Sequence, residues 1–443
     1  MSTPNSNDPN GFSPFGLHKN LMRGVRAAGY ENPRPIQAES IPAILEGRDV
    51  LGLAQTGTGK TAAFALPVIQ HIMNQTTRES RVLVLAPTRE LANQIAEEFQ
   101  TFSKFTDVTG MTIYGGVSMG NQISSLRRRP DVIVGCPGRV LDLMQQGHLK
   151  LNSLDTLILD EADHMFDMGF LPDIKKILSR LPKNRQNLLF SATMPKDIRH
   201  LATDLLSDPH VVELADKAPV STIDHALYRI PEKRKRDLLH VILDRDDFDS
   251  AIIFTRTKHR AKRLADQLSK AGHRSAALQG NMSQSQRDRA MRGFRERTFD
   301  ILVATDIAAR GLDVEKVSHV INFDVPNTPE AYTHRIGRTG RSEREGIAFT
   351  FVTGEDIGWV KATERMIGSK IERRREEGFE PDQEARSSSR SKNGNGRSNR
   401  SRSGSSRSNG SRSNGSRSNG SRSKPKNSSS RKSRGQTSSR SRR

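Results

Sequence analysis

The sequence predicts an α/β protein with two parallel-sheet domains in tandem and a disordered basic C-terminal tail. Its 443 residues are too many for one domain. Strand-like and helix-like segments alternate twice along the chain, as parallel sheets with crossover helices require. After about Asp382 the composition changes completely. We therefore expect domains at 12–207 and 223–381 joined by a polar linker at 208–222, a disordered N-terminus at 1–11 and the tail at 382–443.

The net charge of +21 is concentrated in the tail. From Arg386 to Arg443 there are 18 Lys and Arg residues and no Asp or Glu, which leaves 53 basic and 50 acidic residues before it. The tail repeats Ser-Arg-Ser-Asn-Gly at Ser406–Gly410, Ser411–Gly415 and Ser416–Gly420, and it has no aromatic or aliphatic side chain. Nothing in it can offset the entropy lost on ordering, so we expect a disordered cationic segment.

The composition also bears on location. Cys136 is the only cysteine, which excludes an internal disulfide and fits a reducing compartment. The first ten residues lack the basic and apolar regions of a secretory signal. No stretch approaches the roughly 20 apolar residues of a membrane span. We expect a cytoplasmic protein without membrane contact.

The first predicted strand leads into a glycine-rich loop. An apolar run at Val50–Ala54 precedes Gln55–Thr61, and a helix-like segment follows at Ala62–Met73. Strand, glycine-rich turn and helix in this order are typical of a phosphate-binding loop. The glycines allow backbone N–H groups to form an anion nest. Lys60 can then reach the outer phosphates, and the Thr61 hydroxyl can ligate Mg²⁺. The alternative is an ordinary glycine-rich turn.

A helix at Leu17–Ala28 and a turn at Gly29–Gln37 are expected before this loop. A Gln side chain can bond the N6 and N7 atoms of adenine, and an upstream aromatic ring could stack on the same base. By itself, Gln37 would be an ordinary surface glutamine. Its closeness to the phosphate loop favours a role in reading a nucleotide base.

Polar clusters follow all five predicted strands of the first domain. These strands are Val50–Ala54, Arg81–Ala86, Asp131–Cys136, Thr156–Leu159 and Asn187–Phe190. The clusters after them are, in order, the phosphate loop, Pro87–Ala92, Pro137–Arg139, Asp160–Asp163 and Ser191–Thr193. Ligands of open α/β sheets bind outside the carboxyl ends of the strands, so we expect these clusters to line one site.

Two carboxylates in the Asp160–Asp163 cluster suit phosphoryl transfer. Asp160 ends an apolar strand and can hold Mg²⁺ together with Thr61. Glu161 can orient or deprotonate a water that attacks the γ-phosphate. An acidic helix N-cap would also explain these residues, but the phosphate loop favours an Mg²⁺-dependent nucleoside triphosphatase.

The second domain has a similar alternation but no phosphate loop. Its predicted strands are Ala251–Phe254, Ser275–Leu278, Ile301–Ala304, Val320–Phe323 and Ile347–Val352. Between the first two, Ala261, Leu264, Ala265 and Leu268 recur at helical spacing. The segment His334–Arg341 spaces Arg and Gly so that several guanidinium groups could face one anionic site. A basic surface turn is its alternative reading.

Together these segments resemble the motifs of DEAD-box RNA helicases. The matching segments are Gly29–Gln37, Ala54–Thr61, Pro87–Ala92, Asp160–Asp163, Ser191–Thr193 and His334–Arg341, and the resemblance covers about Phe12 to Phe379. The stretches Arg185–Phe190, Phe254–His259 and Gly378–Asp382 are similar to the bacterial subgroup labelled RhlE. The resemblance implies two RecA-like domains that bind ATP with Mg²⁺ in the cleft between them.

The resemblance also implies roles residue by residue. Phe12 would stack on adenine and Gln37 would read its edge. The remaining ATP-binding residues would be Thr56, Gly57, Thr58, Gly59, Lys60, Thr61 and, at the ribose, Asp313. Thr61 and Asp160 would hold the metal. The catalytic residues would be Lys60, Asp160, Glu161 and two arginine fingers, Arg338 and Arg341.

RNA would lie across both domains. Its contacts in the first domain would be Thr88, Arg89, Gly116, Pro137, Gly138 and Arg139. Its contacts in the second would be Arg256, Gln279, Gly280, Thr305 and Arg310. Coupling between the ATP and RNA sites would fall to Ser191, Thr193 and His334.

Three residues depart from these patterns. Ala54 stands where the phosphate-loop pattern begins with Gly. Cys136 replaces a usual Thr, which removes a hydroxyl contact to RNA phosphate. Arg34 replaces a usual Thr or Ser, which puts its packing against the phosphate loop in question.

The implied activity is RNA-stimulated ATP hydrolysis, with domain closure bending one strand and separating it from its partner. The alternatives are an ATP-gated RNA clamp or RNA chaperone with little unwinding, and a helicase that acts on DNA. The expected partner is structured, duplex or single-stranded RNA, bound by a monomer. Ribosome assembly, RNA decay and cold adaptation stay open as processes, and with them ribosomal particles or the decay machinery as partners.

Overall fold

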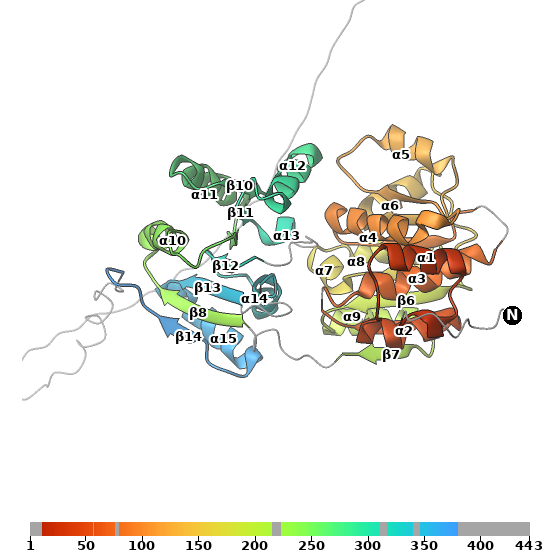
Figure 1. Cartoon of the computed structure of the whole chain (residues 1–443), viewed down its shortest axis with the longest axis horizontal. Coiled ribbons are helices and arrows are strands. Elements are labelled where there is room, and N and C mark those ends of the chain that lie inside the picture. The colour runs from red at the N-terminus through yellow and green to blue at the C-terminus, as the bar shows by residue number, and fades with distance from the viewer. Residues whose placement is uncertain are drawn as a thin grey trace, which may run out of the picture. The chain divides into compact units, whose positions relative to one another are not determined.

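The computed structural model describes residues 11–55, 57–75, 79–214, 223–309, 317–339 and 346–379. Two parallel sheets organise these residues (Figure 1). The predicted tail at 382–443 and most of the predicted N-terminal segment at 1–11 lie outside the described residues.

The first sheet contains seven strands among the described residues, in the order β3-β4-β2-β5-β6-β1-β7. They are β1 (Val50–Leu53), β2 (Val82–Leu85), β3 (Gly110–Ile113), β4 (Val132–Gly135), β5 (Thr156–Leu159), β6 (Gln186–Ser191) and β7 (His210–Glu213). Every pairing is parallel. Such strands are buried on both faces, which explains their continuous apolar runs.

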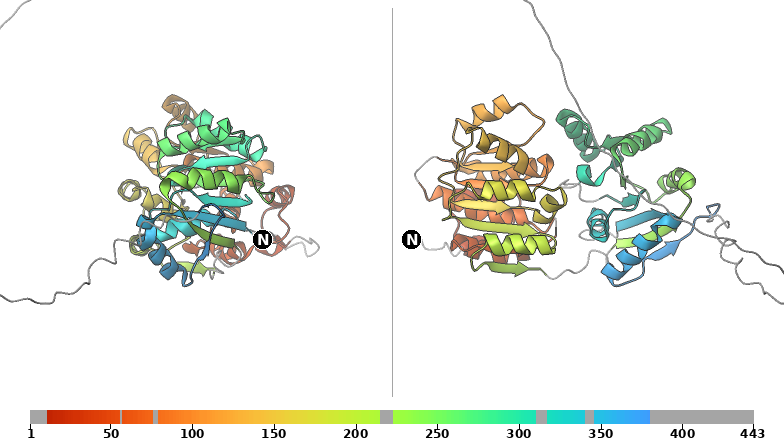
Figure 2. Two further views of the ribbon diagram at one scale, coloured as in Figure 1. Left: turned by 90° about the vertical axis from the view of Figure 1, so that its left-hand side faces the viewer. Right: turned by 180° about the vertical axis from the view of Figure 1, so that it is seen from behind.

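Helices cover both faces of this sheet (Figure 2). They are α1 (Lys19–Ala27), α2 (Pro35–Leu45), α3 (Lys60–Met73), α4 (Arg89–Phe102), α5 (Met119–Leu126), α6 (Pro137–Gln145), α7 (Ala162–Asp167), α8 (Leu171–Leu178) and α9 (Lys196–Leu205). Alternate strand residues enter two separate cores. Val82 and Val84 pack with α1 to α4, whereas Leu83 and Leu85 pack with α6 to α9.

The second sheet also has seven strands within the described ranges, in the order β10-β11-β9-β12-β13-β8-β14. They are β8 (Ile223–Arg229), β9 (Ala251–Phe254), β10 (Ser275–Leu278), β11 (Ile301–Ala304), β12 (His319–Asn322), β13 (Gly346–Val352) and β14 (Glu372–Arg374). Its helices are α10 (Lys235–Leu243), α11 (Lys258–Lys270), α12 (Gln284–Arg295), α13 (Asp306–Ala309), α14 (Pro329–Ile336) and α15 (Ile357–Ile367). The predicted apolar face of α11 is buried.

Several predicted boundaries need correction. The linker was expected at 208–222, but β7 lies within that range and pairs with β1 in the first sheet. Residues 215–222 lie outside the described part. The second sheet gains β8 at its start, and α1 is shorter than the helix expected at Leu17–Ala28.

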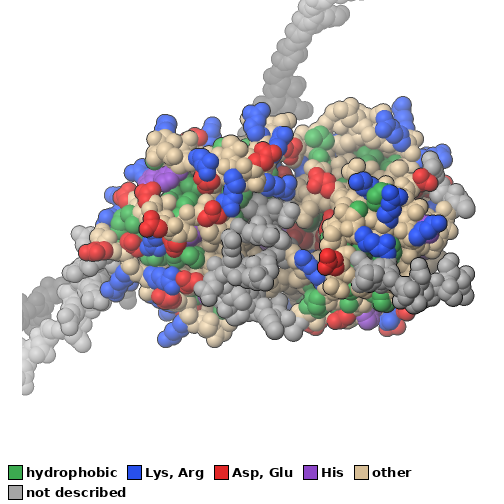
Figure 3. All heavy atoms as spheres, viewed as in Figure 1, with side chains coloured by type: hydrophobic (Ala, Val, Ile, Leu, Met, Phe, Trp, Pro, Cys, Tyr) green, Lys and Arg blue, Asp and Glu red, His purple; other side chains and the backbone are tan. Residues whose placement is uncertain are grey.

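Acidic and basic side chains are interspersed over the described residues on the face seen in Figure 3. This mixture agrees with a nearly neutral body, as the charge count indicates. Among the described residues, we find no helix long and apolar enough to cross a membrane.

Candidate functional site

The phosphate loop joins the end of β1 to the start of α3. Gly57 and Gly59 have φ of 80° and 92°, a conformation that favours glycine. The ammonium of Lys60, the first residue of α3, donates to the carbonyl oxygen of Ala54 at 2.7 Å. The N–H of Ala54 donates to the Ser191 carbonyl oxygen at 3.0 Å, so Ala54 extends the pairing of β1 with β6 and needs no glycine. Thr56 lies outside the described residues.

Arg34 and Gln37 contact this loop directly. The Arg34 guanidinium donates to the Gly57 carbonyl oxygen at 2.6 Å, and the Gln37 amide donates to that of Gly59 at 3.1 Å. The Gln37 side-chain oxygen accepts from the backbone N–H of Arg34 at 2.9 Å. The Arg that replaces a usual Thr or Ser therefore packs against the loop, which answers the question that this departure raised.

Phe12 does not present a face for adenine in this conformation. Its ring is 0% exposed and makes edge contacts with Phe15 and Tyr30, at centroid distances of 5.8 and 6.2 Å. An adenine could stack on it only after neighbouring side chains move. The stacking role of Phe12 stays a prediction.

Asp160 and Glu161 follow β5 and are each 3% exposed. Burial raises the pKa of Asp160 to about 7, although the nearby Lys60 opposes the shift. Burial also disfavours the charged form of Glu161. This effect of burial is outweighed by the charge and hydrogen bond of His164 and by the charges of Lys60 and Arg338. Together they lower the pKa of Glu161 to about 2. The surroundings therefore favour the charged form of Glu161 more strongly than that of Asp160.

The backbone of Glu161 is unusual. Its φ of 51° and ψ of 53° place it in the left-handed region, directly before α7. Such a conformation costs about 1–3 kcal/mol for a residue with a side chain and clusters at functional sites.

The residues fit an Mg²⁺ ion bound mainly through a nucleotide. Asp160 supplies a buried carboxylate at the end of β5, and Thr61 a hydroxyl in the first turn of α3. The described residues contain no group of three or more His, Cys, Asp or Glu side chains that could form a metal cage. Mg²⁺ usually takes only one or two carboxylates and completes its shell with phosphate oxygens and water.

Asp163 ties this segment to Ser191 and Thr193 at the end of β6. Its carboxylate accepts from the backbone N–H and from the hydroxyl of Thr193, both at 2.9 Å. Its own N–H donates to the Ser191 hydroxyl at 3.3 Å, and that hydroxyl donates to the Thr193 carbonyl oxygen at 2.8 Å. The structure thus joins the acidic segment to two of the three predicted coupling residues.

His164 connects Glu161 to the third, His334. Its Nδ1 lies 2.8 Å from Oε2 of Glu161, and its Nε2 lies 3.3 Å from Nδ1 of His334. Burial, followed by the charge of His164, lowers the pKa of His334 to about 4. His164 was missed by the sequence analysis because it lies one residue beyond the recognised motif.

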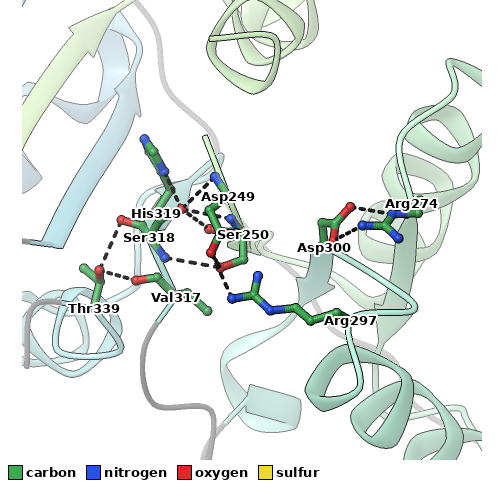
Figure 4. A network of polar contacts seen from close by, with 9 residues as sticks. All are labelled: Asp249, Ser250, Arg274, Arg297, Asp300, Val317, Ser318, His319 and Thr339. Atoms are coloured by element: carbon green, nitrogen blue, oxygen red, sulfur yellow. Dashed lines mark hydrogen bonds and ion pairs between the residues drawn. The ribbon is translucent and has the colours of Figure 1, made fainter. Parts of the chain in front are cut away.

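Arg338 follows α14 and is nearly buried. The next residue, Thr339, anchors it: the hydroxyl donates to the carbonyl oxygens of Val317 and Ser318 at 2.5 and 3.2 Å (Figure 4). The Ser318 hydroxyl in turn donates to the Ser250 carbonyl oxygen at 2.8 Å, before β9. Arg341, Asp313 and Arg310 lie outside the described residues, so their predicted roles stay predictions.

Arg335 forms buried contacts within the second domain that could not be predicted from the motif. It is buried, and it donates to both carboxylate oxygens of Asp306 at 2.5 and 2.7 Å. It also donates to the Asn322 side chain at 3.0 Å and to the Asp324 carbonyl oxygen at 2.8 Å. These contacts fix α14, and with it His334, against the carboxyl ends of β11 and β12.

The expected RNA contacts of the first domain gather around Gly116. A side-chain carbon at Gly116 would lie 2.3 Å from the Arg89 guanidinium, and Arg139 donates to the Val117 carbonyl oxygen at 3.5 Å. Pro137 and Gly138 lie beside Arg139 in the first turn of α6. The hydroxyl of Thr88 is buried and caps α4, where it accepts from the N–H of Leu91 at 3.3 Å. In this conformation Thr88 contributes to the helix start rather than to an exposed surface.

Cys136 lies directly before α6. Its thiol is nearly buried, and burial raises its pKa to about 12. A hydroxyl at this position would be equally buried. The replacement of a usual Thr therefore removes little exposed polar surface.

The expected RNA contacts of the second domain follow adjacent strands. Gln279 and Thr305 come directly after β10 and β11, and Arg256 comes two residues after β9. The three strands are neighbours in the sheet. The Gln279 side chain accepts from the N–H of Asn281 at 2.7 Å across Gly280, so this turn is held by its own side chain.

Two residues of α12 that the sequence analysis did not single out contact the start of α4. The Arg287 guanidinium donates to Glu90 at 2.6 Å, and Arg89 donates to the Gln284 side chain at 3.2 Å. Arg89 is expected to contact RNA, but in this conformation it is hydrogen-bonded to Gln284 of α12.

Comparison with known proteins agrees with this site. A model of the DEAD/DEAH box helicase family matches residues 34–201, and a model of the helicase conserved C-terminal domain matches residues 234–343. The DEAD-box ATP-dependent RNA helicase CshA of Geobacillus kaustophilus is 45% identical over 363 residues, covering 82% of this chain and 78% of that protein. CshA of Bacillus subtilis is 43% identical over 366 residues, covering 82% and 74%.

A solved structure shares the fold. Dbp5 of S. cerevisiae, bound to RNA and ADP BeF3, matches with a TM-score of 0.74 and 33% identity, covering 83% of this chain and 96% of that one. Both sheets therefore belong to RecA-like domains. Both of these relatives are CshA helicases, and they give no support to the finer resemblance to the RhlE subgroup. With its fold, its motifs and these relatives in agreement, the chain belongs to the DEAD-box family of ATP-dependent RNA helicases.

Proposed function

We propose that this helicase hydrolyses ATP with Lys60, Asp160, Glu161 and Arg338, and that hydrolysis drives local separation of short RNA duplexes. The observation that carries the proposal is the environment of Glu161. Its buried, ionised carboxylate feels the charges of Lys60 and Arg338, and it lies two residues before Asp163, which bonds to Thr193. The short segment from Glu161 to Asp163 thus links the residues proposed for ATP hydrolysis to those proposed for coupling with RNA.

Each group has a distinct part in this chemistry. Lys60 binds the outer phosphates, and Arg338 offsets the charge that builds on them in the transition state. With a pKa near 2, Glu161 is a weak base, so it orients the attacking water. Strong proton abstraction is not required, because phosphoryl transfer passes through a largely dissociative transition state. Asp160 and Thr61 would hold Mg²⁺, which would neutralise the phosphate oxygens.

RNA and ATP would act on each other through Ser191, Thr193 and His334. RNA would bind at the two groups of residues around Gly116 and Gln279, and would be told from DNA by its 2′-hydroxyl groups. When both ligands favour one closed conformation, each raises the affinity for the other. Loss of phosphate would then reopen the enzyme and release RNA.

Two substitutions separate phosphate binding from catalysis. Lys60→Ala should weaken ATP binding. Glu161→Gln should preserve ATP binding and lower turnover by about 10²-fold or more, the loss that a misplaced reacting group can cause. ATP affinity and RNA-stimulated ATPase rate are the measurements. Glu97→Gln on the exposed side of α4 is the matched control and should behave as the parent. Parent turnover by Glu161→Gln would refute the catalytic assignment.

A paired assay separates unwinding from clamping. A helicase displaces a labelled strand from an RNA duplex when ATP is supplied, and a matched DNA duplex shows whether the sugar matters. An RNA clamp would instead hold single-stranded RNA while ATP is bound and displace little strand. Strand displacement from RNA but not from DNA is the expected result.

The cellular setting is part of the same proposal. A single cysteine fits a reducing cytoplasm. We expect a monomer, which light scattering would test, and RNA partners in ribosomal particles or in the decay machinery. Sequencing of RNA crosslinked in cells would identify them.

A further inference from the structure

His164 bridges two residues of the proposed mechanism without having a role of its own in the motif. It lies on the short helix α7, three residues after Glu161, and is 2% exposed. Its two ring nitrogens face different partners: Nδ1 faces the Glu161 carboxylate at 2.8 Å, and Nε2 faces Nδ1 of His334 at 3.3 Å.

The partner of Nδ1 defines the direction of the first hydrogen bond. A carboxylate can only accept, so Nδ1 of His164 carries the proton that it donates to Glu161. The second bond joins two ring nitrogens, and which of them donates depends on the tautomers and on the charge of His164. Burial and then the charge of His164 lower the pKa of His334, which favours the neutral form of that ring. One hydrogen-bonded chain therefore connects His334, His164 and Glu161.

The start of α7 does not hold the Glu161 side chain by a capping bond. Glu161 stands in a left-handed conformation at the N-cap of α7, and its side chain makes no capping hydrogen bond there. His164 is buried and its ring packs edge-on against that of His334, with centroids 5.0 Å apart and an interplanar angle of 85°. Because the His164 ring is rigid and packs against His334, its Nδ1 can hold the Glu161 carboxylate in a fixed position.

We propose that His164 is a positioning residue, which fixes the Glu161 carboxylate for the attacking water and makes that position depend on His334. His334 belongs to α14, which also leads to Arg338. The carboxylate would therefore be correctly oriented only when the segment that carries the arginine is in place. This inference rests on the proposed role of Glu161.

The alternative is that His164 has only a structural role and fills space in the interior. The two hypotheses predict different kinetics. If His164 only fills space, its substitutions act through folding, and two variants of similar stability should then have similar apparent kcat values. If His164 positions Glu161, kcat should fall even in well-folded variants. A side chain that keeps a hydrogen-bond donor near the position of Nδ1 should then restore part of the loss.

The experiment compares His164→Leu and His164→Asn in the full-length protein. Leu has similar bulk and no hydrogen-bonding group, whereas the Asn amide can place a donor near the position of Nδ1. The readouts are kcat and KM for ATP at saturating RNA, together with the thermal midpoint. His240→Leu is the matched control, because His240 and His273 form another ring pair, with 3.2 Å between nitrogens, in the second domain.

His164→Leu should lower kcat about tenfold or more with KM for ATP changed less than about twofold, since a 1 Å misplacement of a reacting group can cost ~10²-fold. His164→Asn should recover at least part of this loss, and His240→Leu should stay near the parent. An unchanged kcat in His164→Leu, an equal change in KM, or no recovery by Asn would each overturn the proposal.

A double substitution tests the dependence on His334. If the two histidines act in one chain, His164→Leu combined with His334→Leu should lower kcat little more than the more harmful single change, because groups that act as a unit are non-additive. Fully additive losses would overturn the link to His334. Glu161→Gln distinguishes the levels of failure: if it is inactive while His164→Leu is normal, only this inference fails.

Discussion

The carboxylate of Asp163 accepts two hydrogen bonds from Thr193, one from its backbone N–H and one from its hydroxyl, both at 2.9 Å. This pair joins the acidic segment after β5 to the segment after β6. A change in the position of one segment should therefore shift the other. Hydrogen bonds to charged groups contribute about 1.5–3 kcal/mol.

Thr193→Val should therefore reduce RNA unwinding more than RNA-stimulated ATPase activity. Val keeps the shape but removes the hydroxyl bond, while the backbone bond to Asp163 can persist. Strand displacement and phosphate release, measured on the same preparation, give the ratio of the two activities. Thr203→Val, at an exposed position of α9 whose hydroxyl bonds within its own helix, is the control. A parallel loss of both activities would mean that Thr193 serves hydrolysis rather than coupling.

Arg34→Thr should raise KM for ATP about fivefold with little change in kcat. The Arg34 guanidinium donates to the Gly57 carbonyl oxygen at 2.6 Å and so holds the phosphate loop in shape. A net contribution of about 1 kcal/mol for such a bond corresponds to roughly fivefold in affinity. Titration with a fluorescent ATP analogue measures it directly, with the exposed Arg180→Thr as the charge-matched control. Tighter binding would instead mean that Arg34 keeps the loop in a form that resists ATP.

Arg335→Met should lower the free energy of unfolding of the second domain by about 3 kcal/mol. It removes one partner of a buried ion pair and leaves the Asn322 side chain without its donor from Arg335, and breaking buried pairs costs about 3–5 kcal/mol. We take the lower end because Asp306 is partly exposed. Trp359, the only tryptophan, packs on Tyr332 of α14 at 5.6 Å and reports this domain by fluorescence. An unchanged denaturant midpoint would contradict the assignment.

Cys136 should react slowly with iodoacetamide at pH 8 in the folded protein and quickly in denaturant. Only the thiolate reacts, and burial raises the pKa of Cys136 to about 12, so the folded protein contains very little thiolate at pH 8. Because the folded pKa is raised, this group's contribution to stability is present below the unfolded pKa and is lost as pH rises above it. The single cysteine makes mass spectrometry unambiguous. Equal rates in both states would show that the thiol is accessible.

The sequence was sufficient to predict the central strands and the segments that follow them. Strands such as Val82–Leu85 are buried on both faces, so their composition is wholly apolar and easy to recognise. Four strands were missed because they are less uniform. The edge strand β14 has the sequence Glu-Arg-Arg, and the neighbouring strand β8 mixes polar and apolar residues without a regular pattern.

The site was only partly predictable for a different reason. Roles for motif positions such as Lys60 and Glu161 could be predicted because their spacing is typical of the family. His164, Arg287 and Gln284 bond to partners that are distant in the sequence, or lie outside the recognised motif, so their geometry appears only after folding. Phe12 shows the converse: its position in the pattern suggests a nucleotide contact, whereas packing with Phe15 and Tyr30 buries its ring in this conformation.

The last prediction concerns the basic tail, which lies outside the described residues. From Arg386 to Arg443 it carries 18 positive charges, no acidic group and no aromatic side chain. Base stacking is therefore not available to it, and its contact with RNA should be electrostatic and indifferent to sequence. Each phosphate neutralised on a single strand contributes about −0.7 to the slope of log affinity against log salt.

Truncation after Pro381 should therefore weaken RNA binding and flatten this slope, while the ATPase rate at saturating RNA changes little, because the proposed catalytic residues precede the tail. A salt titration of RNA binding by the full chain and by the truncated chain measures both effects. A full-length variant with the tail sequence scrambled keeps the charge and should keep the steep slope. Equal slopes for full and truncated chains would mean that the tail does not tether RNA, and a loss of slope on scrambling would mean that it recognises a specific partner.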